Sequence, residues 1–199
     1  MLTRRWFFLV APAFAPVCLS AQQFTGSHRV SALPAPVILE RGGSSFQAVL
    51  ARVGDDLYIA GQPTEQGLRD LRAHGVTTIV NLRTPEEMQH VSFNEAALAK
   101  QLGMKYVYLP VRGNDQYPYA PSTVNAFADA LRDANGKVLL HCTVAWRASH
   151  LWAAYLISKR GVAEDSALAN ARAINLMDDH HMAAKQPVEE FLGRPLHGH

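Results

Sequence analysis

The chain has 199 residues, of which 48% are hydrophobic and 18% are charged, and its formal net charge at pH 7 is +2. These are the proportions of a globular protein, and they exclude a disordered or fibrous chain. The length suits one domain with a substantial hydrophobic core, and the sequence contains no internal repeat and no low-complexity tract.

Residues 1–21 have the layout of a secretory signal peptide. Arg4 and Arg5 precede an apolar run over residues 6–19, and two small residues follow it. The run is short and interrupted by proline, so we expect removal on export and no stable membrane span in the mature chain. The arginine pair is also typical of a twin-arginine signal. The sequence therefore predicts a periplasmic or secreted protein, with an uncleaved anchor as the alternative.

Removal of residues 1–21 would change the charge balance and the cysteine count. It takes away two arginines and no acidic residue, so the 19 basic residues fall to 17, equal to the 17 acidic residues. A balanced charge gives no general electrostatic reason to expect nucleic acid or an anionic membrane as a partner. Cys18 would be lost, and Cys142 would be the one remaining thiol. Because a single cysteine forms no internal disulfide, chemistry explains Cys142 better than structure does, although a buried, inert cysteine is the alternative.

Three segments come after the predicted signal peptide. Residues 22–45 contain prolines, glycines and scattered polar residues, which is typical of an extended leader. The folded domain is predicted over residues 46–180. Residues 181–199 are predicted to form a short C-terminal helix and a tail.

Short apolar strands alternate with amphipathic helices through the predicted domain. N-caps such as Thr64 and Ser122, and stop signals such as Gly75 and Gly103, mark where elements begin and end. The predicted strands span residues 48–53, 57–60, 76–80, 105–109 and 138–140. The predicted helices run from Thr64 to Gly75, over residues 93–102, 122–134 and 164–172, and from Arg147 to Gly161. We therefore expect an α/β fold with a mostly parallel central sheet and helices on both faces.

Parallel sheets bind ligands beside the carboxyl ends of their strands. Three predicted features meet at that edge: a polar loop over residues 81–87, an irregular stretch over residues 111–121, and Cys142 directly after the last strand. The fold therefore predicts one cleft that contains Cys142.

The stretch Val138–Gly161, VLLHCTVAWRASHLWAAYLISKRG, carries the clearest chemical signal. A buried strand leads into Cys142, four residues come next, and Arg147 begins a long amphipathic helix. Successive backbone N–H groups and a helix N-terminus at such a turn form an anion site, and their positive field favours the thiolate form of a cysteine. The guanidinium of Arg147 matches two oxygens of a phosphate or sulfate. The pattern indicates a thiolate nucleophile beneath a bound oxyanion.

Three segments together resemble the bacterial dual-specificity-type phosphatases of the cysteine-dependent superfamily. They are YIAGQPTEQGLRDLRAHGVTTIVNLRTPEE (Tyr58–Glu87), YVYLPV (Tyr106–Val111) and the Val138–Gly161 stretch. The order of their GQP, NLR and HC motifs is more specific than any one motif. The chain is most similar to the subfamily with a shortened Cys-x4-Arg active-site loop, and the resemblance covers about residues 57–177.

The resemblance implies a fold of the dual-specificity phosphatase type and a phosphoric monoester hydrolase of the protein tyrosine or dual-specificity class. Cys142 would attack phosphorus and form a cysteinyl-phosphate that water hydrolyses, and Arg147 would hold the equatorial oxygens. Asp115, in the loop after the 105–109 strand, would be the general acid that protonates the leaving oxygen. The resemblance implies no metal and no other cofactor. The substrate would be a phosphorylated protein or a small phosphomonoester.

The four residues between the predicted nucleophile and the arginine would bind the substrate: Thr143, Val144, Ala145 and Trp146. Two of them depart from the subfamily pattern. Ala145 stands where a glycine is usual, and glycine adopts backbone angles that strain alanine. The Trp146 ring would either stack on an aromatic substrate or block the site.

Other residues near the predicted cleft have two interpretations each. Arg83 would reach the cleft and bind substrate, and an ion pair with Glu86 or Glu87 is the alternative. His141 is predicted to support the loop by hydrogen bonds rather than to act as a base. Asp115 is either the general acid or an aspartate in a solvated turn.

Four histidines near the C-terminus invite comparison with a metal cluster: His180, His181, His197 and His199. Their segment lacks cysteines or carboxylates at the helical spacing of metal ligands, so we predict solvated histidines and no metal site.

The sequence thus predicts an exported, cysteine-dependent phosphatase-like protein that hydrolyses a phosphomonoester through Cys142. Two alternatives stay open. A catalytically inactive pseudo-phosphatase would hold an anion without turning it over, and the departures at Ala145 and Trp146 favour it. A rhodanese-like sulfurtransferase would carry a persulfide on Cys142 in a loop of this shorter length, although the GQP and NLR motifs favour a phosphatase.

Overall fold

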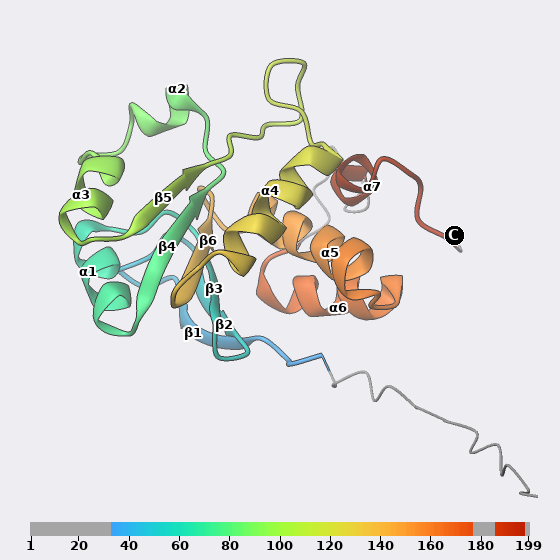
Figure 1. Cartoon of the computed structure of the whole chain (residues 1–199), viewed down its shortest axis with the longest axis horizontal. Coiled ribbons are helices and arrows are strands. Elements are labelled where there is room, and N and C mark those ends of the chain that lie inside the picture. Colours follow the sequence, from blue (N-terminus) through green and yellow to red (C-terminus); the bar gives the residue numbers. More distant parts are fainter. Residues whose placement is uncertain (1–32, 177–185, 198–199) are drawn as a thin grey trace, which may run out of the picture. The chain divides into compact units, whose positions relative to one another are not determined.

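The computed structural model describes residues 33–176 and 186–197. A six-stranded sheet lies at its centre (Figure 1). Its strands are β1 (Val37–Arg41), β2 (Val49–Val53), β3 (Leu57–Ala60), β4 (Val76–Asn81), β5 (Lys105–Tyr108) and β6 (Lys137–His141). They lie in the order β1-β2-β3-β6-β4-β5. The four strands from β3 to β5 pair in parallel, whereas β1–β2 and β2–β3 are antiparallel, so the predicted mostly parallel sheet is confirmed.

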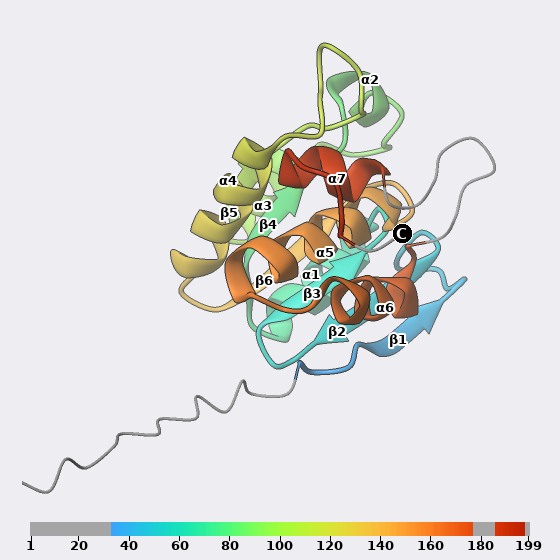
Figure 2. The same cartoon turned by 90° about the vertical axis from the view of Figure 1, so that its right-hand side faces the viewer.

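Helices cover both faces of the sheet, as predicted (Figure 1). They are α1 (Glu65–Ala73), α2 (Pro85–Met88), α3 (Glu95–Gln101), α4 (Pro121–Arg132), α5 (Trp146–Arg160), α6 (Glu164–Ile174) and α7 (Gln186–Leu192). On one side, α1 and α3 pack with the sheet around Leu68 and Leu98. On the other side, α4 to α7 bury Phe127, Leu151 and Phe191, and α7 lies against α4 and α5 (Figure 2).

The apolar run in β6 fixes the place of Cys142 in the fold. Val138 and Leu140 enter the core under α4 and α5, and Leu139 enters the core under α1 and α3. A strand buried on both faces needs apolar residues at every position rather than at alternate ones. β6 therefore lies between β3 and β4 in the middle of the sheet and delivers Cys142 to its carboxyl edge.

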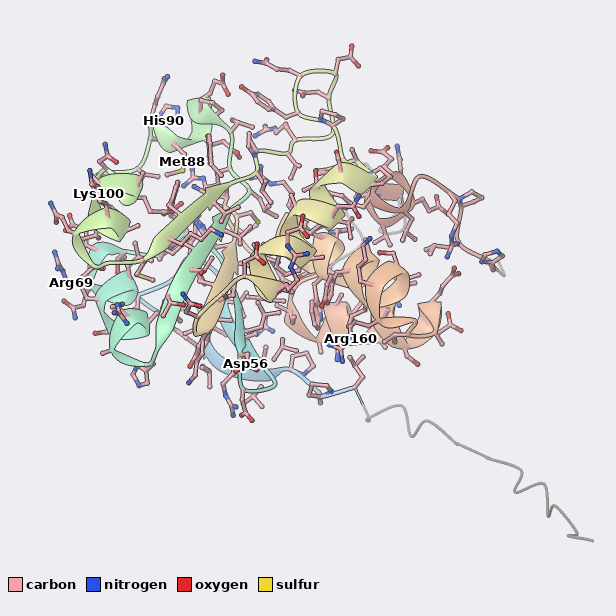
Figure 3. All side chains as sticks on the ribbon, viewed as in Figure 1. Asp56, Arg69, Met88, His90, Lys100 and Arg160 are labelled. Atoms are coloured by element: carbon pink, nitrogen blue, oxygen red, sulfur yellow. The ribbon has the colours of Figure 1, made fainter. Side chains whose placement is uncertain are left out.

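The candidate site lies at that carboxyl edge. Met88 and His90, on and just after α2, lie at this edge, and Asp56, in the β2–β3 turn, lies at the opposite one (Figure 3). Among the described residues, no helix is both long and apolar enough to cross a membrane.

The first strand begins inside the segment for which the sequence predicts an extended leader. β1 pairs with β2 in an antiparallel register that includes an irregularity between Ile38 and Glu40. Val37 and Leu39 are about half exposed, at 46% and 50%, because β1 is an edge strand. Its weak alternation of polar and apolar residues hides the strand at the level of sequence.

Two helix starts differ from the sequence prediction. Ser122 is not the N-cap of α4: the helix begins at Pro121, and the cap residue Ala120 makes no side-chain hydrogen bond. Proline fits the first helical position because its missing N–H would have no partner there. The single turn α2 lies in a stretch predicted as loop, and Thr84 and Glu87 form a capping box around it.

Candidate active site

The nucleophile loop, residues His141–Arg147, joins β6 to α5. Cys142 is 1% exposed at its base. The Thr143 carbonyl accepts a hydrogen bond from the Gln62 N–H at 2.8 Å, and the Val144 carbonyl accepts one from an Asn175 side chain. In a trans peptide the N–H points away from the carbonyl, so the N–H groups of the residues after Thr143 and Val144 point away from Gln62 and Asn175. Hydrogen bonds from neighbouring segments to the loop carbonyls therefore fix the orientation of these peptides.

Ala145 occupies a backbone conformation that favours glycine. Its φ is +67° and its ψ is −1°, in the left-handed region, at the residue before α5. A residue with a Cβ atom is less stable than glycine in this region by about 1–2 kcal/mol. The presence of alanine in place of glycine predicts this strain, and the structure shows the angle that causes it.

Arg147 is buried and its terminal nitrogens are fully engaged. Nη1 donates to the carbonyl of Val111 at 2.7 Å and to that of Leu82 at 3.2 Å. Nη2 donates to the Thr143 hydroxyl at 3.1 Å. Both nitrogens also donate to the Glu87 carboxylate, at 2.9 and 2.8 Å. Three loops of the carboxyl edge thus converge on one guanidinium.

The pair of Arg147 and Glu87 stays charged. Burial alone would lower the pKa of Arg147, but its interactions with Cys142 and with the Glu87 carboxylate outweigh that effect and raise the pKa. Burial alone would raise the pKa of Glu87, but the hydrogen bonds from Arg147 and from the Thr84 amide lower it. The two shifts agree, so a fixed positive group lies beside Cys142.

Arg83 is buried beside the loop, and its terminal nitrogens bond neutral oxygens rather than the carboxylate of Glu86 or Glu87. Its Nη1 donates to the Gln62 side-chain carbonyl at 2.6 Å, and its Nη2 donates to the backbone carbonyl of Glu87 at 2.8 Å. The Glu87 carboxylate, the expected ion-pair partner, binds Arg147 and Arg112 instead. Burial lowers the pKa of Arg83, although the carboxylate of Glu87 opposes that effect.

His141 is fully buried at the start of the nucleophile loop. Its Nε2 lies 2.9 Å from Oε1 of Glu95, whose side chain is also fully buried. The Gln62 side chain donates to Oε2 of the same carboxylate at 2.6 Å. The contact with Glu95 ties the start of the nucleophile loop to α3.

Asp115 lies apart from the nucleophile loop. The β5–α4 loop closes on itself through hydrogen bonds from the Arg112 and Gly113 amides to the Tyr117 carbonyl, and it projects from the body of the domain (Figure 1). Asp115 is exposed in this loop, and within the described residues no hydrogen bond joins it to the nucleophile loop. The structure therefore brings together Cys142 and Arg147 but not the predicted general acid.

The Trp146 ring packs against its own helix. It lies over the His150 ring, with 4.0 Å between the ring centroids and 49° between the planes. The ring is half-buried, so part of its surface is open to solvent at the start of α5.

A hollow of about 540 Å³ opens beside the nucleophile loop on the side of Thr143. It lies between the segment before β2, the GQP turn after β3 and the chain after α2, on which Figure 3 labels His90. Its walls combine apolar and polar side chains with one buried arginine: Phe46, Gln47, Gln62, Thr64, Arg83, His90 and Phe93. This composition suits an organic group attached to a phosphate at the loop.

Glu87 and Tyr119 are two of the residues that shape the site although the sequence prediction does not place them there. Glu87 is expected from the sequence only as a partner of Arg83, although the Thr84-x-x-Glu87 capping box is a signal that could place it at a helix start. Tyr119 lies near Arg147 and Cys142, and burial raises its pKa to about 12. No spacing rule connects a tyrosine before α4 with the loop after β6.

Within residues 33–176 and 186–197, no three His, Cys, Asp or Glu side chains gather as metal ligands would. His197 bonds Glu164 through its ring and its backbone N–H. His180, His181 and His199 lie outside the described residues.

Known proteins share this fold. The structure of a DUF442 protein from Shewanella putrefaciens CN-32 aligns with a TM-score of 0.58 and 26% identity, over 78% of this chain and 94% of that one. TpbA of P. aeruginosa, solved in complex with phosphotyrosine, aligns with a TM-score of 0.50 over 67% of this chain and 80% of its own. At 23% identity, TpbA shows a likeness of fold alone.

Sequence comparison points the same way. A beta-lactamase hydrolase-like protein of Xylella fastidiosa (strain Temecula1) is 31% identical over 103 residues, and the match covers 51% of this chain but 23% of that relative. The family model described as DSP-PTPase phosphatase fused to NAD+ kinase matches residues 47–190, more than half of the chain. The chain belongs to this family of dual-specificity-type phosphatases.

Proposed function

We propose that the protein hydrolyses a phosphomonoester through a cysteinyl-phosphate on Cys142. The observation that carries this proposal is the placement of the Cys142 thiol directly after β6, within electrostatic reach of the buried, charged Arg147. The family and the fold support a phosphatase function in general.

The reaction would proceed in two displacements. The Cys142 thiolate attacks phosphorus, an S–P bond forms, and the P–O bond to the leaving group breaks. Water then attacks phosphorus, the S–P bond breaks, and inorganic phosphate and the thiolate are released. Arg147 would stabilise the charge that develops on the phosphoryl oxygens, because it is already charged before substrate binds. Its Nη2–Thr143 bond is the contact that an incoming oxygen can replace.

Proton transfer to the leaving oxygen is assigned to Asp115. The β5–α4 loop that carries it leads from the carboxyl edge into Tyr119, beside the predicted nucleophile. Asp115 is solvated here, so the proposal requires the loop to move toward the site when substrate binds. A general acid contributes about 10²–10⁴-fold to such a reaction.

The substrate is proposed to be a phosphorylated protein or a small phosphomonoester. The hollow beside Thr143, with Phe46 and Phe93 in its walls, offers space for the group esterified to phosphate. The phosphotyrosine bound by TpbA, a protein of similar fold, is one compound of this class.

Turnover of p-nitrophenyl phosphate by the wild type and by Cys142→Ser tests the proposal. We expect hydrolysis by the wild type that the substitution abolishes, since a serine hydroxyl in this site is a far weaker nucleophile than a thiolate. The absence of turnover across about pH 5 to 8, with the thiol shown to be reduced, would refute the proposal.

A binding protein without turnover is the second candidate, because Ala145 is strained and Cys142 is almost fully buried. It predicts tungstate binding by calorimetry with no hydrolysis. The family match gives the rhodanese-like alternative no support, and transfer of sulfur from thiosulfate to cyanide would be its test.

We also propose export directed by residues 1–21, which lie outside the described residues. N-terminal sequencing of protein recovered from a periplasmic fraction should begin near Gln22. A replacement of Arg4 and Arg5 by lysine separates the two export routes, since only the twin-arginine route requires arginine. Recovery of the intact N-terminus from the cytoplasm alone would contradict export.

A further inference from the structure

Both ends of the nucleophile loop are paired with carboxylates, one fully buried and one partly buried. At its start His141 pairs with Glu95, and at its end Arg147 pairs with Glu87. Cys142 lies between the two pairs. The position of the Cys142 thiol relative to the Arg147 guanidinium therefore depends on the positions of both carboxylates. The question is whether further contacts link Glu95 to Glu87.

Glu95 is a buried anchor with both oxygens occupied. Oε1 faces the His141 Nε2 at 2.9 Å and the Asn81 side-chain amide at 3.4 Å, and Oε2 accepts from Gln62 at 2.6 Å. Burial alone would raise the pKa of Glu95, but its interaction with His141 and the hydrogen bond from Gln62 lower it. A carboxylate taken out of water is stable only when its oxygens are satisfied in this way.

Gln62 and Arg83 continue the chain of contacts from this anchor. The Gln62 amide donates through Nε2 to Glu95 and accepts through Oε1 from Nη1 of Arg83, each at 2.6 Å. These two partners fix which way the amide faces. The other terminal nitrogen of Arg83 donates to the backbone carbonyl of Glu87 at 2.8 Å, and the Glu87 side chain binds Arg147.

The contacts therefore form a closed ring. They start at His141, pass through Glu95, Gln62, Arg83 and Glu87, and end at Arg147. The nucleophile loop itself completes the ring.

We propose that Glu95 and Gln62 are positioning residues that link the two ends of the nucleophile loop, so that Cys142 and Arg147 are held in register by one network. This rests on the proposed function for its kinetic readout, but its binding readout does not require turnover. Neither residue is proposed to exchange a proton with substrate.

The ring has features that stability alone does not require. A buried ion pair adds little net stability over apolar residues of the same size, so its value lies in fixing one arrangement. Gln62 is only half-buried, yet both the nitrogen and the oxygen of its side-chain amide bond charged residues of the ring. Hydrogen bonds with charged partners are the strong and directional ones.

Two variants open the ring at different points. Gln62→Met keeps the length of the side chain and removes both amide contacts. Glu95→Gln keeps the shape and turns one acceptor oxygen into a donor that faces another donor. Gln66→Met is the matched control, because Gln66 is an exposed glutamine of α1 that bonds only Asp70 in the next turn.

We expect each ring variant to lower kcat for p-nitrophenyl phosphate by about tenfold or more with KM changed by less than about threefold, because misplacement costs the transition state more than the ground state. Orthovanadate, which mimics the pentacoordinate phosphorus, should bind more weakly by about the same factor as kcat falls. Gln66→Met should change neither value. The double variant should be no worse than the more impaired single variant, because one opened ring cannot be opened again.

Three results would overturn the inference. One is an unchanged kcat and vanadate affinity in Gln62→Met, measured on protein that circular dichroism shows to be folded. Another is a loss in the double variant equal to the product of the single losses, which would mean independent roles such as direct contact of Gln62 with substrate. A third is an equal loss in Gln66→Met. If the wild type shows no turnover, the proposed function fails, and vanadate affinity alone decides this inference.

Discussion

The loop after β6 and the loop after β5 reach the same edge of the sheet but are built differently. The loop after β6 is buried, and its carbonyls and its arginine are bonded to neighbouring loops. The tip of the loop after β5, residues 113–117, bonds to its own loop, and Asp115 in it is exposed. The half of the site proposed to bind the oxyanion is therefore part of the folded core, whereas the half proposed to donate the proton is not.

This difference has an energetic meaning. A preorganised guanidinium contributes to catalysis because its orientation is fixed before the substrate arrives. A general acid needs only to come within hydrogen-bond reach in the complex, so its position without substrate matters less. The two halves should consequently respond differently to substitution.

The largest effect is expected from the buried half. Arg147→Lys should lower kcat/KM for p-nitrophenyl phosphate by about 10³-fold, because an ammonium group cannot reproduce the fork that spans Glu87 and the phosphoryl oxygens. Arg132→Lys, on the exposed face of α4, is the control. A loss below about tenfold would show that the guanidinium is not the oxyanion-binding group.

The exposed half should depend on the leaving group. Asp115→Asn should lower kcat for phenyl phosphate by about 10²-fold, and less for p-nitrophenyl phosphate, whose leaving oxygen needs little protonation. Comparison of the two substrates measures this difference directly. Equal and small losses with both would leave Asp115 as a residue of a solvated turn, and Asp129→Asn shows the effect of removing an aspartate from the surface.

The ion pair between Glu87 and Arg147 should contribute to the free energy of unfolding. Glu87→Gln should lower the free energy of unfolding at pH 7 by about 2 kcal/mol, since Arg147 loses a charged partner. The folded-state pKa of Glu87 is lowered, so its contribution is present above the ordinary carboxyl pKa and is lost as pH falls below it. The free energies of unfolding of the wild type and of Glu87→Gln should therefore differ less near pH 3 than at pH 7, which urea unfolding measures. A difference that grows toward acid would contradict this expectation.

The smallest effect concerns the strained turn within the buried half. Ala145→Gly should stabilise the protein by about 1 kcal/mol, because glycine adopts a φ of +67° without strain, less the extra freedom it has when unfolded. Thermal unfolding should shift upward by about 2–4 °C. A lower midpoint would mean that the alanine methyl contributes more by packing than its backbone costs.

The sequence predicts the buried half far better than the exposed one. Val138, Leu139 and Leu140 specify a central strand by composition alone, and the spacing from Cys142 to Arg147 specifies the turn and the helix start after that strand. These are local signals, read within a few residues of the features they predict.

The rest depends on contacts between distant segments. Glu95 is 46 residues from His141, and no pattern in either segment announces their pairing. Likewise Glu87 is 60 residues from Arg147, and no pattern in the sequence distinguishes Arg147 from Arg83 as its partner. β1 escapes prediction because an edge strand needs no regular alternation, and Ser122 is wrong as a cap because Pro121 starts the helix first.

The most direct test of the account is to trap the covalent intermediate. Acid quenching of the enzyme during turnover of a phosphomonoester, followed by mass spectrometry of the peptide that contains Cys142, should show one added phosphoryl group on its sulfur. The adduct should be absent from Cys142→Ser, and it should accumulate in a variant that slows hydrolysis of the intermediate more than its formation. Turnover by the wild type without any phosphoryl group on Cys142, or with the group on another residue, would contradict the proposed mechanism.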